Sequence, residues 1–346
     1  MKLNIGQNLM IKHNQPYFGA KELKAAKKTI SMGLVSQGVE VSKFETELCN
    51  FFGLPQGHAI VVSSGSSALY LALWALKAKN KKIALPVYSC SSLRNAVGMI
   101  GGRSIFVDCA KDSPNLDFEK LKKTKLDILI APSMFGIPLI FPRYKKYRVI
   151  EDLSQALGAE FSGKKIGLRG EVGICSFYAT KMITSGGQGG AIISKNKKII
   201  DIIRDYREFD CRKDSKFRFN FQMTDLQASI GRVQLTRLSS FIKKRENWFK
   251  LYKKEGLDLL DCNSKLVKPV RYRIVLRTKN PKKVIKELGK SNINAIVPIN
   301  QYELLDKSCS YKFAQELCRN TVSLPAHVGL KKSDILRISN IAKEFA

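Results

Sequence analysis

The sequence predicts an α/β protein in which helices cover a large, mostly parallel sheet and a smaller α/β domain follows. Between residues 59 and 150, short apolar runs alternate with helical segments, which is typical of parallel strands joined by crossover helices. A second, shorter alternation of strand and helix patterns follows a long helical pattern near the C-terminus. We therefore expect a large domain over residues 1–239, which includes the N-terminal segment, and a small domain over residues 240–346.

The N-terminal part begins with two helical patterns. Leu23, Ala26 and Ile30 lie on one helical face, and a second helix over 41–52 ends at Gly53. A helix is also expected over residues 67–78. Five short apolar runs read as strands: 59–62, 83–85, 105–107, 128–131 and 149–150.

The C-terminal part begins with a long helical pattern that follows Thr224 and continues past the expected domain boundary. Residues 273–276 and 293–297 predict strands, and residues 281–288 predict a helix between them. This shorter alternation is the basis for the smaller domain.

Composition limits the class of protein. The chain has 346 residues and is 44% hydrophobic, enough for a large core, and we expect no membrane span and no N-terminal leader. Eight cysteines are scattered without a Cys-x-x-Cys pair, and the three histidines are far apart, so we expect no metal site. Reduced thiols and a cytoplasmic location fit this pattern.

The net charge of +31 raises the alternative of a DNA-binding or regulatory protein. The lysines, however, form short separate runs without interleaved aromatic residues, and no helix-turn-helix spacing is present. A lysine-rich solvated surface is the favoured interpretation, with no specific nucleic acid partner. A positive field that attracts an anionic substrate also stays open.

A glycine and several serines lie between the first expected strand and the helix after it. In Ser63-Ser64-Gly65-Ser66-Ser67, the glycine allows close approach of the backbone, and the helix start offers free amide donors to a phosphate. An ordinary turn with a serine cap would have the same appearance. The motif therefore supports a phosphate site only in combination with the other motifs of the chain.

Two further motifs supply an acid and an amine. Asp152 ends an apolar strand, where a carboxylate can keep a pyridinium nitrogen protonated, and Gln155 follows one turn later. Lys181 follows Ser176 and precedes a glycine cluster at 186–190. An amine for an aldehyde, an acid for a ring nitrogen and donors for a phosphate are what pyridoxal 5'-phosphate requires.

With these motifs in this order, the sequence resembles the sugar-nucleotide aminotransferases of the DegT/StrS type, which have fold type I of the pyridoxal phosphate enzymes. The matching segments include Gly33–Gly38, Ser64–Ser66, Glu151–Asp152, Ser176 with Lys181, Asn220, and Gln227–Leu235. The resemblance implies a large domain like that of aspartate aminotransferase and a smaller C-terminal domain.

The resemblance also implies roles for single residues. Lys181 would form the Schiff base and shuttle the proton, Asp152 would bind the ring nitrogen, and Gln155 the ring hydroxyl. The remaining cofactor contacts would come from Gly65, Ser66, Ser67, Cys90 and Ser176, and from Asn220 of a second subunit. A homodimer with shared active sites follows from that last contact.

Two positions depart from the family pattern. Gln188 stands where many members have glutamate, and Cys90 stands where many place an aromatic ring against the cofactor, with Tyr88 as a nearby alternative. The expected reaction transfers an amine from glutamate to a keto-sugar nucleotide, which yields an amino sugar for surface polysaccharide or glycoside biosynthesis. A sugar dehydratase of the same family is the alternative, but those enzymes carry histidine in place of Lys181.

Overall fold

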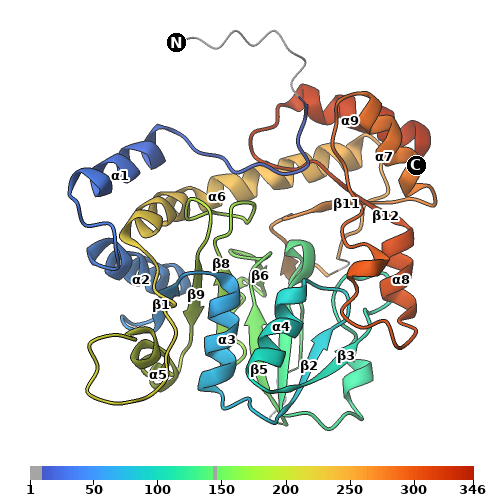
Figure 1. Ribbon diagram of the computed structural model, residues 1–346. Coiled ribbons are helices and arrows are strands. Elements are labelled where there is room, and N and C mark those ends of the chain that lie inside the picture. The colour runs from blue at the N-terminus through green and yellow to red at the C-terminus, as the bar shows by residue number, and fades with distance from the viewer. Residues whose placement is uncertain (1–9, 143–145, 263) are drawn as a thin grey trace.

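The computed structural model describes residues 10–142, 146–262 and 264–346 (Figure 1). The expectation of no N-terminal leader concerns residues 1–9, which lie outside the described ranges. The central sheet has seven strands. In spatial order they are β1 (Ala59–Val62), β9 (Gly190–Ile193), β8 (Val172–Ser176), β5 (Arg148–Asp152), β4 (Ile128–Pro132), β2 (Lys82–Pro86) and β3 (Arg103–Val107). Only β9 runs against both of its neighbours, which confirms the prediction of a mostly parallel sheet.

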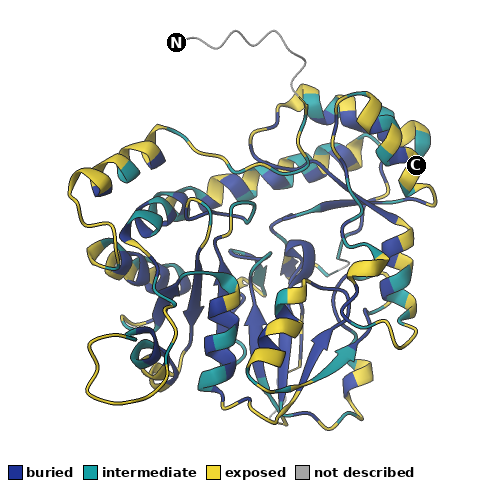
Figure 2. Ribbon diagram, viewed as in Figure 1, coloured by how far each residue is buried: buried dark blue, intermediate teal, exposed yellow. Residues whose placement is uncertain are grey.

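Helices cover both faces of this sheet, and the alternation of side chains along β1 shows how. Ile60 and Val62 pack on the side of α3 (Gly65–Ala75) and α4 (Ser91–Met99). Val61 packs on the other side, with α2 (Val39–Phe52). All four residues of β1 are buried, and the sheet lies as a buried layer between the helices (Figure 2).

The helix signals in the sequence correspond to capped helices. α2 ends at Gly53, which has the left-handed φ of 66° that glycine adopts without strain. α6 (Asp225–Lys254) begins at Thr224, whose side chain and that of Gln227 form a capping box. Because α6 runs through residue 240 without a break, the division into domains there stays a prediction. α1 (Ala20–Ser31) lies along α6, and α5 (Lys197–Arg207) lies by β1.

The C-terminal part has its own apolar core, formed with the second half of α6. There β11 (Ile274–Arg277) pairs antiparallel with β12 (Thr321–Leu324). The helices of this part are α7 (Pro281–Lys290), α8 (Lys312–Arg319) and α9 (Lys332–Phe345). The strand expected over 293–297 is wrong: this segment makes only isolated bridges from Ile293 and Ile296, because Asn294 and Pro298 interrupt the apolar pattern.

Short elements complete the described chain: β6 (Glu160–Phe161), β7 (Lys164–Lys165), β10 (Val267–Lys268), and the 3₁₀ turns η1 (Glu119–Leu121), η2 (Met134–Gly136) and η3 (Gln301–Glu303). No helix in the described ranges is long and apolar enough to cross a bilayer. The topology brings the carboxyl end of β5 and the start of α3 to one edge of the sheet, where ligands of such folds bind.

Candidate active site

A cavity of about 300 Å³ lies at this edge of the sheet. Residues of the sequence motifs line it: Gly65, Ser66, Cys90, Asp152, Gln155, Ser176, Lys181 and Gln188. They come from the start of α3, the loop before α4, the ends of β5 and β8, and the loops that follow those strands. Segments distant in sequence thus form one polar site.

The start of α3 forms one wall of the cavity. Ser64 caps the helix, and its hydroxyl accepts a hydrogen bond from the amide of Ser67 at 3.0 Å. A Cβ atom on Gly65 would lie 2.7 Å from the Cβ of Ser176, so only glycine allows this approach. The site thus combines hydroxyl groups with the positive end of a helix dipole, which favours a phosphate.

Ser67 differs from its neighbours in this loop. Its hydroxyl is buried and lies 3.0 Å from the hydroxyl of Ser63 and 2.8 Å from that of Ser64. The side chain of Ser67 therefore supports the loop from within, and Ser66 presents its side chain to the cavity instead.

Asp152 is the last residue of β5 and is only 5% exposed. Its Oδ1 accepts a hydrogen bond from the amide of Ser154 at 2.8 Å. Burial raises the pKa of this carboxyl, although that hydrogen bond and the nearby charge of Lys181 oppose the rise. A buried carboxylate with little compensation is suited to a cationic partner, such as the protonated nitrogen of a pyridinium ring.

Gln155 is oriented by a backbone contact. Its Oε1 accepts a hydrogen bond from the amide of Phe135 at 2.7 Å, and Phe135 itself has a positive φ of 60°. Because the oxygen is occupied, the amide nitrogen of Gln155 is the group available to the cavity. That nitrogen is a donor, as a bound phenolate or hydroxyl oxygen would need.

Lys181 lies in the loop after β8 and lines the cavity. Its Nζ lies 5.5 Å from the ring centroid of Tyr272, which is 6% exposed. Although burial opposes it, the charges of Lys181 and Arg273 lower the pKa of Tyr272. Sequence reasoning did not identify Tyr272, because it belongs to the C-terminal part and only the fold places it beside Lys181.

Cys90 and Tyr88, the two candidates for stacking against the cofactor, differ in burial. Cys90 is exposed, caps α4 and lines the cavity. Tyr88 is wrong as an alternative stacking residue: it is fully buried and packs edge-on against Phe135 in the core.

Asn220 does not line the cavity. It is exposed on the segment between α5 and α6, and its Oδ1 accepts a hydrogen bond from the amide of Gln222 at 2.9 Å. The neighbouring residue Phe221 touches the other end of the site, since its carbonyl accepts a hydrogen bond from the amide of Ser63 at 2.9 Å. The role of Asn220 toward a second subunit therefore stays a prediction.

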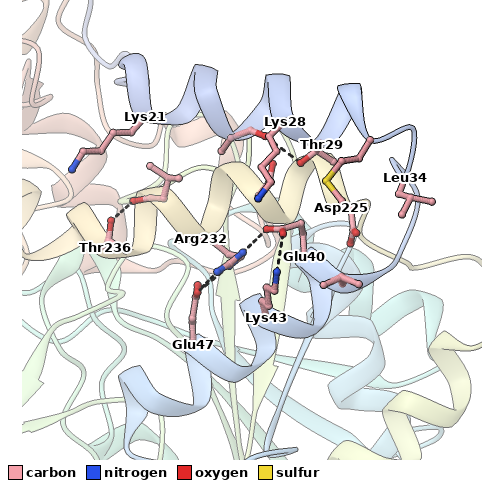
Figure 3. Close-up of a pocket in the computed structure, with 15 residues that line it drawn as sticks. Lys21, Lys28, Thr29, Leu34, Glu40, Lys43, Glu47, Asp225, Arg232 and Thr236 are labelled. Carbon is pink, nitrogen blue, oxygen red and sulfur yellow. Dashed lines mark hydrogen bonds and ion pairs between the residues drawn. The ribbon is translucent and has the colours of Figure 1, made fainter.

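A second cavity, of about 490 Å³, lies between α1, α2 and the start of α6 (Figure 3). Its two glutamates are paired with arginine: Arg232 contacts Glu40 and also Glu47, the latter at 2.6 Å. The motif residues Lys181 and Asp152 line the first cavity and not this one, so we do not assign the reaction to it. Its rim is apolar, however, and Met32, Leu34 and Val39 are all exposed.

The described residues contain no group of three or more His, Cys, Asp or Glu side chains that could hold a metal ion. The first cavity instead fits pyridoxal phosphate. Lys181 offers an amine, Asp152 a buried carboxylate of raised pKa, and the start of α3 an anion site. The requirement for glycine at position 65 agrees with a cradle that closes around a ligand.

Comparisons with known proteins show similarity to one enzyme family. The sequence model of the DegT/DnrJ/EryC1/StrS aminotransferase family matches residues 16–343. The chain is 32% identical to a UDP-4-amino-4,6-dideoxy-N-acetyl-beta-L-altrosamine transaminase of Campylobacter jejuni, over 71% of this chain and 69% of that protein.

Solved structures are similar over nearly the whole length. The aminotransferase TlmJ from Streptoalloteichus hindustanus has a TM-score of 0.90 at 21% identity, covering 97% of this chain and 98% of its own. A putative sugar aminotransferase from Streptococcus pneumoniae, in its PLP form, has a TM-score of 0.86 at 18% identity, covering 97% of this chain and 100% of its own. At these identities the likeness establishes the fold.

Proposed function

This chain belongs to the DegT/DnrJ/EryC1/StrS aminotransferase family and is a pyridoxal phosphate-dependent aminotransferase; on that premise, we propose that it aminates a keto-sugar nucleotide with glutamate as donor. The product would be an amino sugar for polysaccharide or glycoside biosynthesis. The single observation that carries the assignment is the cavity in which Lys181, Asp152 and the start of α3 meet. The similarity to a UDP-sugar transaminase supports the substrate class.

The cofactor, when bound, supplies an electron sink that allows a proton to leave the carbon next to the transferred nitrogen. In our proposal, Ser66, Ser176 and the first amides of α3 bind the phosphate. Asp152 would keep the ring nitrogen protonated, and Gln155 would donate to the ring hydroxyl from its free amide nitrogen. Lys181 would hold the cofactor, and its amine would move the proton.

We further propose that two chains form a homodimer with shared sites. α1 supports this proposal: its apolar residues Leu23 and Ile30, which share a helical face in the sequence, are 69% and 59% exposed in the single chain. The segment that carries Asn220 also exposes Phe217 almost completely. A second copy would bury both surfaces and bring Asn220 to its partner's site.

A cytoplasmic location completes the proposal, and the eight unpaired cysteines support it because reducing compartments keep thiols free. The dehydratase alternative loses support from Lys181, which lines the cavity where those enzymes carry histidine. The DNA-binding alternative gains nothing from the site, whose polar groups line a cavity rather than a basic surface.

The proposal is tested by incubating the purified holoenzyme with glutamate and a panel of keto-sugar nucleotides. Formation of 2-oxoglutarate together with an aminated sugar nucleotide is the expected result. Release of the sugar's hydroxyl without amine transfer would favour the dehydratase, and no turnover with any keto-sugar nucleotide would reject the substrate class.

A further inference from the structure

Two arginines next to the active site have no carboxylate partner among the described residues. Arg245, on α6, is 4% exposed, and Arg273, just before β11, is partly buried. The neighbouring Arg271 differs from them, because it binds Glu246 at 2.9 Å and Asp261 at 2.5 Å. Since a buried charge is tolerated only when it is compensated, the first two arginines require a counter-charge from elsewhere.

The hydrogen bonds of these residues are also incomplete. Arg245 donates from Nη1 to the carbonyl of Tyr272 at 3.0 Å, but its buried Nε makes no hydrogen bond within the described chain. The buried Nη1 of Arg273 makes none either, nor does either ring nitrogen of His327, a side chain that is 6% exposed. Buried polar groups in folded proteins normally have partners, so the guanidinium N–H groups and the single N–H of the His327 ring are candidates to bind a ligand.

Burial and the positive charge of this cluster both lower the pKa of two neighbouring histidines. Burial, followed by the charge of Arg273, lowers the pKa of His13 to about 3. Burial, followed by the charge of Arg245, lowers the pKa of His327 to about 4. Both imidazoles are therefore neutral at pH 7, and the positive charge of the cluster resides on the two arginines.

Tyr272 connects this cluster to the reaction centre. Its ring centroid lies 5.5 Å from the Nζ of Lys181 on one hand and 5.9 Å from the Cζ of Arg273 on the other. Its carbonyl is the group that holds Arg245. Tyr272 thus contacts the reaction centre through its ring and the arginine cluster through its ring and its carbonyl.

We propose that Arg245, Arg273 and His327 bind a carboxylate of the amino donor while its amine reaches the position of Lys181. This inference rests on the proposed function, since it assumes that the donor is an amino acid such as glutamate. A planar carboxylate matches the fork of guanidinium donors. The burial of Arg245 and His327 favours this compact anion over a diphosphate, which carries a sugar and a nucleoside on its two sides.

The test measures binding of glutarate, a dicarboxylate without an amine, to the holoenzyme by titration calorimetry. Arg273→Gln should weaken glutarate binding about tenfold to a hundredfold, as expected for one lost hydrogen bond between charged groups. The KM for glutamate should rise similarly, while the KM for the keto-sugar nucleotide stays the same. Arg273→Lys should retain part of the affinity, because it keeps the charge but loses the fork.

Arg277→Gln is the matched control. It removes the arginine at the end of β11, four residues after Arg273, whose partner Asp258 lies 3.5 Å away, and it should leave glutarate binding unchanged. Melting temperatures of all variants without glutarate identify any variant that fails to fold. If Arg273→Gln fails to fold, the glutarate affinity of Arg273→Lys alone tests the inference, since this variant preserves the charge and most of the side-chain volume.

Unchanged glutarate affinity in Arg273→Gln and Arg273→Lys would overturn the inference. So would a loss of UDP affinity with intact glutarate affinity, which would assign the cluster to the diphosphate. Failure of the proposed function looks different: the wild type would aminate no keto-sugar nucleotide, yet its glutarate affinity would still depend on Arg273.

Discussion

Replacing Gly65 by alanine tests the architecture of the phosphate cradle. The new Cβ would lie 2.7 Å from the Cβ and 2.9 Å from the Oγ of Ser176, whereas carbon atoms in contact normally lie about 3.5–4.0 Å apart. Ser176 belongs to β8, which is buried and paired on both sides, so it yields only with its strand. The methyl group therefore forces the start of α3 and the end of β8 apart.

The magnitude follows from these contacts. Overpacking of a buried site costs about 1–3 kcal/mol, and alanine recovers at most about 1 kcal/mol through its better helix propensity. Displacement of the Ser176 hydroxyl also removes one donor to an anionic phosphate, which corresponds to about a tenfold to hundredfold loss of affinity. Gly65→Ala should thus lower both stability and affinity for the cofactor.

Gly98→Ala is the control for this experiment. Gly98 is exposed on α4, has no atom of another residue within 4 Å of an added Cβ, and does not have a positive φ. The same substitution there should stabilise the protein by up to about 1 kcal/mol. Urea unfolding of the apoprotein and titration with pyridoxal phosphate, followed by its visible absorbance, measure both quantities. If Gly65→Ala binds the cofactor like the wild type and is no less stable than Gly98→Ala, the cradle is placed incorrectly.

Four further predictions concern the roles of single residues, the sharing of sites between subunits, and the net charge. Lys181→Ala should lose the covalent link to the cofactor, so that borohydride no longer fixes pyridoxal phosphate to the chain; full turnover by this variant would reject the assignment. Asp152→Asn should abolish most activity. Because burial raises the pKa of Asp152, the native apoprotein holds its proton more tightly than the unfolded chain, and stability falls as pH rises through the carboxyl's titration. Apo Asp152→Asn should therefore melt at a higher temperature than the apo wild type at pH 8, and this advantage should shrink as the pH falls toward 4; a constant difference would refute the burial argument. Mixing Lys181→Ala with Asn220→Ala should restore some activity if sites are shared, whereas a fully active monomer would exclude sharing. Turnover below saturation with the sugar nucleotide should fall with added salt more than turnover at saturation, given the net charge of +31.

The parts of the fold that were predictable are those in which the apolar pattern is local. The strand over residues 59–62 has apolar neighbours on both faces and sits in the sheet as expected. The strands β8 and β9 were not recognised, because Gly173 and Gly190 interrupt their patterns. These glycines are required by close packing: a Cβ on Gly190 would lie 2.3 Å from the carbonyl oxygen of Ser64.

Some residues of the candidate site could be predicted from the sequence, and others could be found only in the structure. Asp152 and Lys181 were found from the sequence because each lies at a strand end or beside a glycine cluster, and chain order alone indicated their proximity. Arg245, Arg273 and His327 could not be found in that way. They lie on α6, before β11 and after β12, and in a chain with 60 lysines and arginines a further arginine carries no signal. They are distinguished only in the structure, where each has a buried nitrogen without a hydrogen-bond partner among the described residues.

Asp152 and Arg245 both link the stability of the free chain to its affinity for ligands. Each is buried, and neither compensates the charge of the other: Asp152 lies near the charge of Lys181, whereas Arg245 is held by the carbonyl of Tyr272 and has no carboxylate partner among the described residues. Both charges therefore reduce the stability of the free chain, since desolvation is unfavourable for each. A cationic ring nitrogen would compensate the first and a donor carboxylate the second, so that each ligand should raise the melting temperature by binding only the folded state. The same two side chains thus link low stability of the free chain to affinity for two ligands of opposite charge.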